Sequence, residues 1–215
     1  MDATTLKKGD HICGLYSSRG ELAEIVADFV VDGLRRKHQC WFITSGDETE
    51  DVREALAERG VAVSREISRG ALQLISGDGT YLVHGAFDPE QAIKTFNDAI
   101  DKAYRDGFTG FRAAAEMSWA LARADIASQL IVYEALLKAL FASARATGLC
   151  LYHRDRTPLA VVDGALATHP VVHSAGAYQA NPFYDESVAG LMPFDAGMVD
   201  AKLTALGRAR RRLDT

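Results

Sequence analysis

Short apolar runs and longer stretches with helical spacing alternate along this chain. The runs predict buried β-strands, because a strand covered on both faces has no polar side. The longer stretches carry apolar residues three or four positions apart, which is typical of amphipathic helices. Strands are predicted at residues 11–16, 39–44, 71–75, 110–116 and 149–153, with an edge strand at 171–173. Helices are predicted at residues 21–36, 47–59, 89–105, 126–146 and 158–167.

Local signals support several of these boundaries. Pro89 suits a first helical turn, where its missing N–H costs nothing. Gly60 and Gly148 are expected to end the helices before them. Because strands and helices alternate, the strands should pair in parallel through right-handed crossovers. The predicted fold class is therefore α/β, a three-layer sandwich around a mainly parallel, RecA-like central sheet.

This architecture predicts where a ligand binds. In open parallel sheets, ligands bind outside the carboxyl ends of the strands. The candidate ligand-binding residues near those ends are Tyr16, Arg19, Thr44, Glu116, Trp119, Tyr152 and His153.

Each of the most informative candidates also has a structural interpretation. Glu116 is interpreted as a hydrogen-bond acceptor for the ligand and Trp119 as an aromatic wall of an apolar pocket. Alternatively, Glu116 pairs with Arg112 or Arg123, and Trp119 fills the core. His153 is the best candidate for a titratable pocket group, or else a histidine in a solvated loop. No Ser-His-Asp or Cys-His arrangement points to a catalytic residue.

Composition and charge narrow the classes of protein. The chain has 215 residues and a net charge of −5, so its main body has no electrostatic reason to bind nucleic acid. An odd number of cysteines, three, without a CxxC pair argues against a disulfide framework and favours the cytoplasm. No apolar run approaches the roughly 20 residues that span a bilayer. We expect one domain over residues 1–190. Residues 191–215 should form an amphipathic basic helix or a linker, which could pair two copies as a homodimer.

Several segments together resemble the MEDS domain, a sensory domain of methanogens and methylotrophs. The similarity covers residues 7–185 and rests on the order of Gly9–Tyr16, Glu116–Trp119, Leu151–His153, His169-Pro170 and Asn181–Tyr184. The resemblance implies a relative of RecA-type ATPases without the phosphate-binding lysine. It also implies a sensor of small organic molecules. The signal would pass to an output kinase, an anti-sigma factor or a DNA-binding module.

The loop after the first strand tests the alternative of ATP binding. A P-loop requires a lysine that reaches the terminal phosphate. The corresponding stretch, residues 14–21, has glycines one position too far apart and Glu21 at the lysine position. Nucleotide hydrolysis is therefore not expected here, although a helix N-terminus with Arg19 beside it could hold an anion.

Metal binding is a weaker alternative. His11 and Cys13 share one face of the first strand, and Cys150 and His153 lie on a strand that could be near. The spacing matches no standard zinc site. A structural role for His11, such as a bond to a loop carbonyl, is favoured, and His169-Pro170 is expected to shape a turn. The residues identify no cofactor. The functions left open are a small-molecule sensor, a RecA-like ATP-binding protein and a non-catalytic scaffold.

Overall fold

The computed structural model shows an α/β fold built on a seven-stranded sheet. It describes residues 3–44, 46–77, 81–83, 86–119, 130, 133, 134, 136, 137, 140, 141, 143 and 145–185. The strands lie in the order β3-β2-β6-β7-β1-β8-β9. Their bounds are β1 His11–Tyr16, β2 His38–Thr44, β3 Leu72–Ser76, β6 Gly110–Glu116, β7 Ala146–His153, β8 Val171–Ser174 and β9 Ala177–Ala180. All pairings are parallel except the one between β8 and β9.

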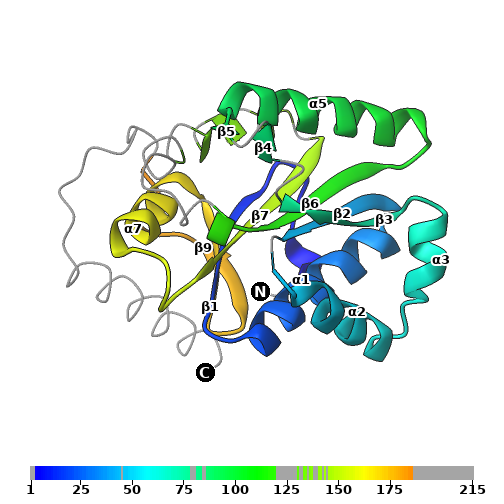
Figure 1. The fold of residues 1–215 in the computed structure, drawn as a ribbon, viewed down its shortest axis with the longest axis horizontal. Coiled ribbons are helices and arrows are strands. Elements are labelled where there is room, and N and C mark those ends of the chain that lie inside the picture. Colours follow the sequence, from blue (N-terminus) through cyan, green and yellow to red (C-terminus); the bar gives the residue numbers. More distant parts are fainter. Residues whose placement is uncertain are drawn as a thin grey trace.

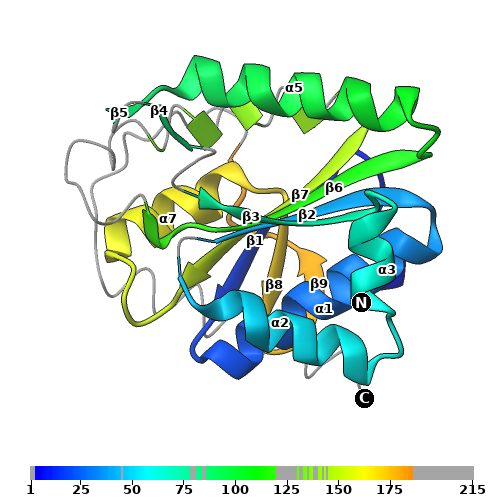
Figure 2. The same ribbon diagram turned by 45° about the vertical axis from the view of Figure 1, so that its right-hand side comes forward.

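Helices cover both faces of this sheet and make it the middle of three layers (Figure 1). They are α1 Arg19–Arg35, α2 Glu48–Glu58, α3 Val63–Ser68, α5 Pro89–Arg105 and α7 Leu159–Thr168. Figure 2 shows α1 and α2 on one side of the sheet and α5 on the other. A 3-10 turn, Ala3–Thr5, precedes β1, and a small ladder joins β4 Leu82–Val83 to β5 Ala86–Phe87.

The alternation of side chains along each strand divides the interior into two cores. The α1 face of the sheet carries the strand residues that pack with α1: Ile12, Tyr16, Cys40, Phe42, Ala114, Leu149 and Leu151. The α5 face carries those that pack with α5 and α7: Cys13, Leu15, Ile43, Phe111, Ala113, Ala115, Cys150 and Tyr152. Both faces of the central strands are buried, which explains their continuous apolar runs.

The structure confirms the α/β class, the parallel sheet and the five main strands. The helix expected at residues 126–146 is wrong at its C-terminal end, because Ala146 already begins β7. Gly148 lies inside that strand and ends no helix. A Cβ atom at Gly148 would lie 2.2 Å from the Phe141 ring, so the glycine is needed for close packing.

The edge of the sheet also differs from the prediction. Strand β8 lies between β1 and β9, so it is not an edge strand. The hairpin from β8 to β9 turns through Ala175 and Gly176, whose φ angles are 50° and 74°. Two positive φ values are typical of the tight turns that join hairpin strands. An alanine at the first position hid this turn from sequence analysis.

Within the described residues, no helix is long and apolar enough to cross a membrane. The segment from residue 186 to residue 215, which includes the predicted basic helix, lies outside them.

Candidate functional site

Three predicted residues meet at the carboxyl edge of the sheet on the α1 face. The Tyr16 hydroxyl donates a 2.8 Å hydrogen bond to Glu116 Oε1, and the Tyr16 ring lies edge-on to His153 at 5.0 Å. The second oxygen of Glu116 accepts the backbone N–H of Ser118 at 3.0 Å and also its hydroxyl. Burial raises the pKa of Glu116, while these bonds oppose the rise. The carboxyl group is therefore satisfied by the protein itself.

Two further predicted residues bond to helix α2 near this edge. The Thr44 hydroxyl donates to Glu48 Oε2 at 2.7 Å. Exposed Arg19 forms a 2.6 Å ion pair with Asp51 and donates to the carbonyl of Asp47. These contacts tie the start of α1 and the end of β2 to α2.

The loop that was compared with a P-loop is occupied by its own side chains. Ser18 caps α1 by accepting the N–H of Glu21, and Glu21 Oε2 accepts the N–H of Ser17 at 2.8 Å. This reciprocal arrangement resembles a capping box. A carboxylate thus takes one backbone donor that a phosphate would need, which agrees with the expectation drawn from Glu21. Nucleotide binding and the RecA-like relationship stay predictions.

The remaining two predicted residues lie on the other side of the sheet. Tyr152 belongs to the α5 face, because it alternates with His153 along β7. Trp119 packs into the core there, stacked on Tyr81 with ring centroids 4.3 Å apart. The seven predicted residues therefore do not form a single pocket, although all of them lie near strand ends or just beyond.

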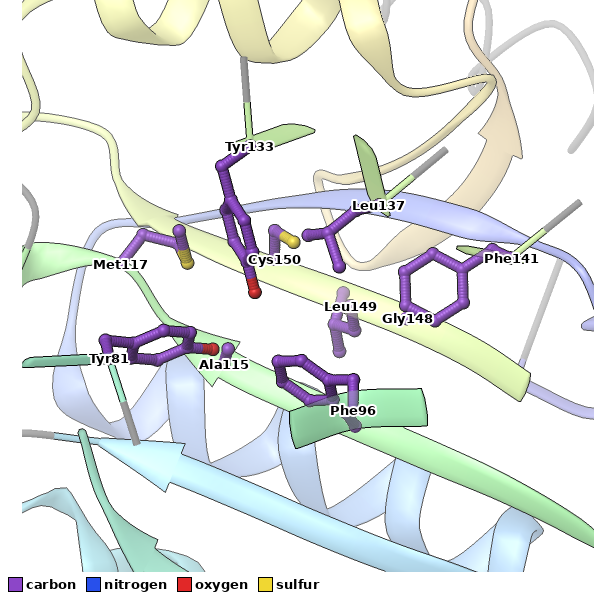
Figure 3. Close-up of a pocket in the computed structure, with 11 residues that line it drawn as sticks. Tyr81, Phe96, Ala115, Met117, Tyr133, Leu137, Phe141, Gly148, Leu149 and Cys150 are labelled. Carbon is purple, nitrogen blue, oxygen red and sulfur yellow. The ribbon is translucent and has the colours of Figure 1, made fainter. Parts of the chain in front are cut away.

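An apolar pocket lies on the α5 face, away from the α1-face group (Figure 3). Figure 3 shows the Met117 and Cys150 sulfur atoms and the Tyr81, Tyr133 and Phe96 rings around one space. The apolar pocket is lined by Tyr81, Phe96, Ala113, Ala115, Met117, Tyr133, Leu137, Phe141, Gly148, Leu149 and Cys150. None of the predicted ligand-binding residues is in this lining, so their role stays a prediction.

The apolar pocket contains a polar group without a good partner. Within the described part of the chain, the buried hydroxyl of Tyr133 makes no hydrogen bond of good geometry, and the Tyr81 phenol is the hydroxyl group that interacts with it. Burial raises the pKa of Tyr133 well above its ordinary value, so the hydroxyl remains protonated and can donate. Unpaired buried donors are costly, and ligand pockets characteristically place a few of them among apolar walls.

Four buried side chains that can bind metal meet beside this pocket. We call this group the buried cluster; it consists of His11, Glu134, Cys150 and His169, whose ligand atoms all lie within 4.8 Å of one another. Glu134 Oε2 lies 3.2 Å from His11 Nε2, 3.4 Å from His169 Nε2 and 3.8 Å from Cys150 Sγ. Cys150 Sγ lies 3.5 Å from His11 Nε2. Tyr152 donates to Glu134 Oε1 at 2.5 Å.

Burial controls the charges of the buried cluster. Desolvation lowers the pKa of His11 and of His169 to about 3, so both rings are neutral near pH 7. Desolvation also raises the pKa of Glu134 and of the Cys150 thiol. Each shift has the same cause, since a charged group loses its water in this interior.

Sequence analysis found only part of the buried cluster. It named His11 and Cys150 but favoured a loop carbonyl as the partner of His11, whereas the structure places Glu134 there. Cys13, the other weak metal candidate, is paired with Cys150 in the strand register but is not in the four-residue group. His169 was expected to shape a turn, and it lies fully buried against Glu134. Glu134 carried no signal, because a glutamate in a predicted helix is usually solvated.

Comparison with known proteins supplies one match. A family model described as "MEthanogen/methylotroph, DcmR Sensory domain" matches residues 10–170 of the 215. The matched region covers β1 to the end of α7 and so includes the apolar pocket and the buried cluster. No curated protein matches the chain.

Proposed function

Because the chain belongs to the MEDS family of sensory domains, we propose that it senses a small apolar organic molecule held in the apolar pocket. The observation that carries this proposal is the lining of that pocket, where aromatic rings, aliphatic side chains and sulfur atoms surround the hydroxyl groups of Tyr81 and Tyr133. Such a surface favours molecules with little polarity, because transfer of apolar surface from water is worth about 25 cal/mol per Å².

The size of the apolar pocket restricts the ligand further. The space is small and has room for about one water molecule. A ligand of a few heavy atoms can therefore enter only if side chains of the lining move. Met117 can supply such movement, since its unbranched side chain changes rotamer at low cost.

Sensing also requires two protein states with different affinities for the ligand. Met117 follows β6 directly and its N–H bonds to the carbonyl of Leu151 on β7. A molecule that displaces Met117 would therefore act on the segment that carries Glu116 and Trp119 at the edge of the sheet. The proposed output is a kinase, an anti-sigma factor or a DNA-binding module, and the proposed assembly is a homodimer.

The proposal is tested by NMR of protein with labelled methyl groups on methionine and leucine. Dichloromethane serves as a small apolar probe and toluene as one too large for the space. We expect saturable shifts of the Met117 and Leu137 methyl signals with dichloromethane and none with toluene at matched concentration.

A variant on the same strand locates the binding. Ala115→Val fills the apolar pocket and should abolish the saturable shift. Ala114→Val is the matched control, because Ala114 is the neighbouring buried residue and faces α1. The proposal is supported if Ala115→Val loses the saturable shift and Ala114→Val retains it. It is contradicted if dichloromethane causes no saturable shift in the wild-type protein, or if the two variants show the same saturable shift.

A further inference from the structure

We propose that the buried cluster is a binding site for one divalent transition-metal ion of the zinc type, with His11, Glu134, Cys150 and His169 as its four protein ligands. This inference does not depend on the proposed sensing function. It rests on the spacing of the ligand atoms, on the charges and on the hydrogen bonds around them.

Four of the six distances between ligand atoms are close to those of a tetrahedral site, and all six are within 4.8 Å. Zn–N and Zn–O bonds of about 2.0–2.1 Å place such atoms about 3.3–3.4 Å apart, and a Zn–S bond of about 2.3 Å places sulfur about 3.6 Å from them. In the buried cluster, Glu134 Oε2 lies 3.2 and 3.4 Å from the two Nε2 atoms. The Cys150 sulfur lies 3.5 Å from His11 Nε2 and 3.8 Å from Glu134 Oε2.

The ring of His169 presents a lone pair to the centre of the buried cluster. Its Nδ1 lies 2.7 Å from the carbonyl oxygen of Ala165. Because a carbonyl only accepts hydrogen bonds, Nδ1 carries the proton, and Nε2 of the neutral ring is unprotonated. Nε2 faces Glu134 at 3.4 Å without a hydrogen bond in the described structure. An ionised Glu134 repels this lone pair, and a cation between the two atoms would make both contacts attractive.

Further hydrogen bonds hold two of the ligands in place. The bond from His169 to Ala165 and the bond from Tyr152 to Glu134 Oε1 are of the kind that orient metal ligands in proteins. His11 differs, since its Nδ1 has no such partner among the residues described.

The charges also balance. Two neutral histidines, one thiolate and one carboxylate carry a charge of −2, which a divalent ion cancels. A neutral assembly avoids the large cost of an isolated buried charge. Binding therefore requires the Cys150 thiol to release its proton, because the thiolate is the metal ligand. Sulfur and imidazole ligands in tetrahedral geometry favour zinc over magnesium or calcium.

Titration of the metal-free full-length chain with Co²⁺ in the absence of oxygen tests this proposal. We expect one equivalent to bind, with the intense visible bands of tetrahedral Co²⁺ and a thiolate-to-cobalt band in the near ultraviolet. Zn²⁺ should displace it. No binding in the wild-type protein, or the weak spectrum of octahedral Co²⁺, would overturn the proposal.

Variants assign the ligands. Cys150→Ser should lose the thiolate band, whereas Cys13→Ser should keep it, because Cys13 is the neighbouring buried cysteine outside the cluster. Tyr152→Phe removes only the supporting hydrogen bond and should weaken Co²⁺ binding about 10–100-fold. Since this variant preserves volume, it remains informative if Cys150→Ser fails to fold. A thiolate band retained in folded Cys150→Ser, or unchanged affinity in Tyr152→Phe, contradicts the assignment.

Discussion

Two buried carboxyl groups lie on opposite faces of the same sheet, and their surroundings differ. On the α1 face, Asp32 pairs with the guanidinium of Arg112 at 2.5 Å and with that of Arg36 at 2.9 Å. On the α5 face, the contacts of Glu134 within the described residues come from two neutral histidines, a thiol and a phenol. The first group has permanent cations supplied by the chain. The second, within the described residues, has neutral side chains around it, and three of them can bind a metal ion.

This difference separates a structural site from a candidate binding site. Arg112 also donates to the carbonyl of Phe29 at 2.8 Å and packs over the Phe29 ring. The ion pair thereby joins α1 to the middle of β6 without help from any ligand. The α5 face combines the buried cluster with the apolar pocket, and Cys150 belongs to both. Cys150 is therefore the point at which a metal and a small molecule would influence each other.

The largest expected effect concerns the ion pair. Arg112→Met leaves Asp32 without its buried partner and should lower the free energy of unfolding by about 3–5 kcal/mol. Urea denaturation followed by circular dichroism measures the loss. Arg36→Gln is the control, because the Arg36 side chain is 40% exposed, and its removal should cost at most about 1 kcal/mol. Equal losses in the two variants would show that Arg112 has no special role.

An intermediate effect concerns pH. Burial, followed by the charge of Arg112, lowers the pKa of His38 from 6.5 to about 4. The unfolded chain therefore takes up a proton that the folded protein does not, and stability falls as the pH drops from about 6.5 towards 4. Replacement by glutamine should flatten this decline by up to about 1.4 kcal/mol per pH unit.

Urea denaturation of His38→Gln between pH 7 and pH 4 checks this expectation. An NMR titration of His38 in Arg112→Met is a second test. The pKa of His38 should rise in this variant, because the guanidinium charge that lowers it has been removed. A His38 pKa near 6.5 in the wild-type protein would contradict the prediction.

The smallest effect compares two tyrosines. Tyr16→Phe removes one bond to Glu116, which keeps its bonds to Ser118, so we expect a loss of about 1 kcal/mol. Tyr152→Phe leaves an oxygen of Glu134 without its donor and should cost more, about 1–3 kcal/mol. Thermal or urea unfolding of the metal-free variants measures the two losses of stability and shows which is larger. Only Tyr152→Phe should alter Co²⁺ binding, and an effect of Tyr16→Phe on it would remove the distinction between the faces.

Much of the fold could be predicted from local sequence patterns, but part of the candidate site could not. The bounds of β1 and α5 follow directly from the apolar run at residues 11–16 and from Asp88-Pro89, where Asp88 does cap the helix. The short strand β9 was missed because its turn begins with an alanine of positive φ. The glycine at position 148 was misread, since a tight contact with Phe141 and a helix terminus both favour glycine.

The sequence by itself determined the α/β class, the parallel pairing and the absence of a P-loop lysine at Glu21, because each depends on residues close together in the chain. Only the tertiary structure decided which polar residues share a site. His11, Glu134, Cys150 and His169 come from four segments, and strand alternation placed Tyr16 and Tyr152 on opposite faces. The spacing of residues along the chain cannot show that these side chains come together. Their contact depends on the order of the strands in the sheet and on which face of each strand packs against which helix.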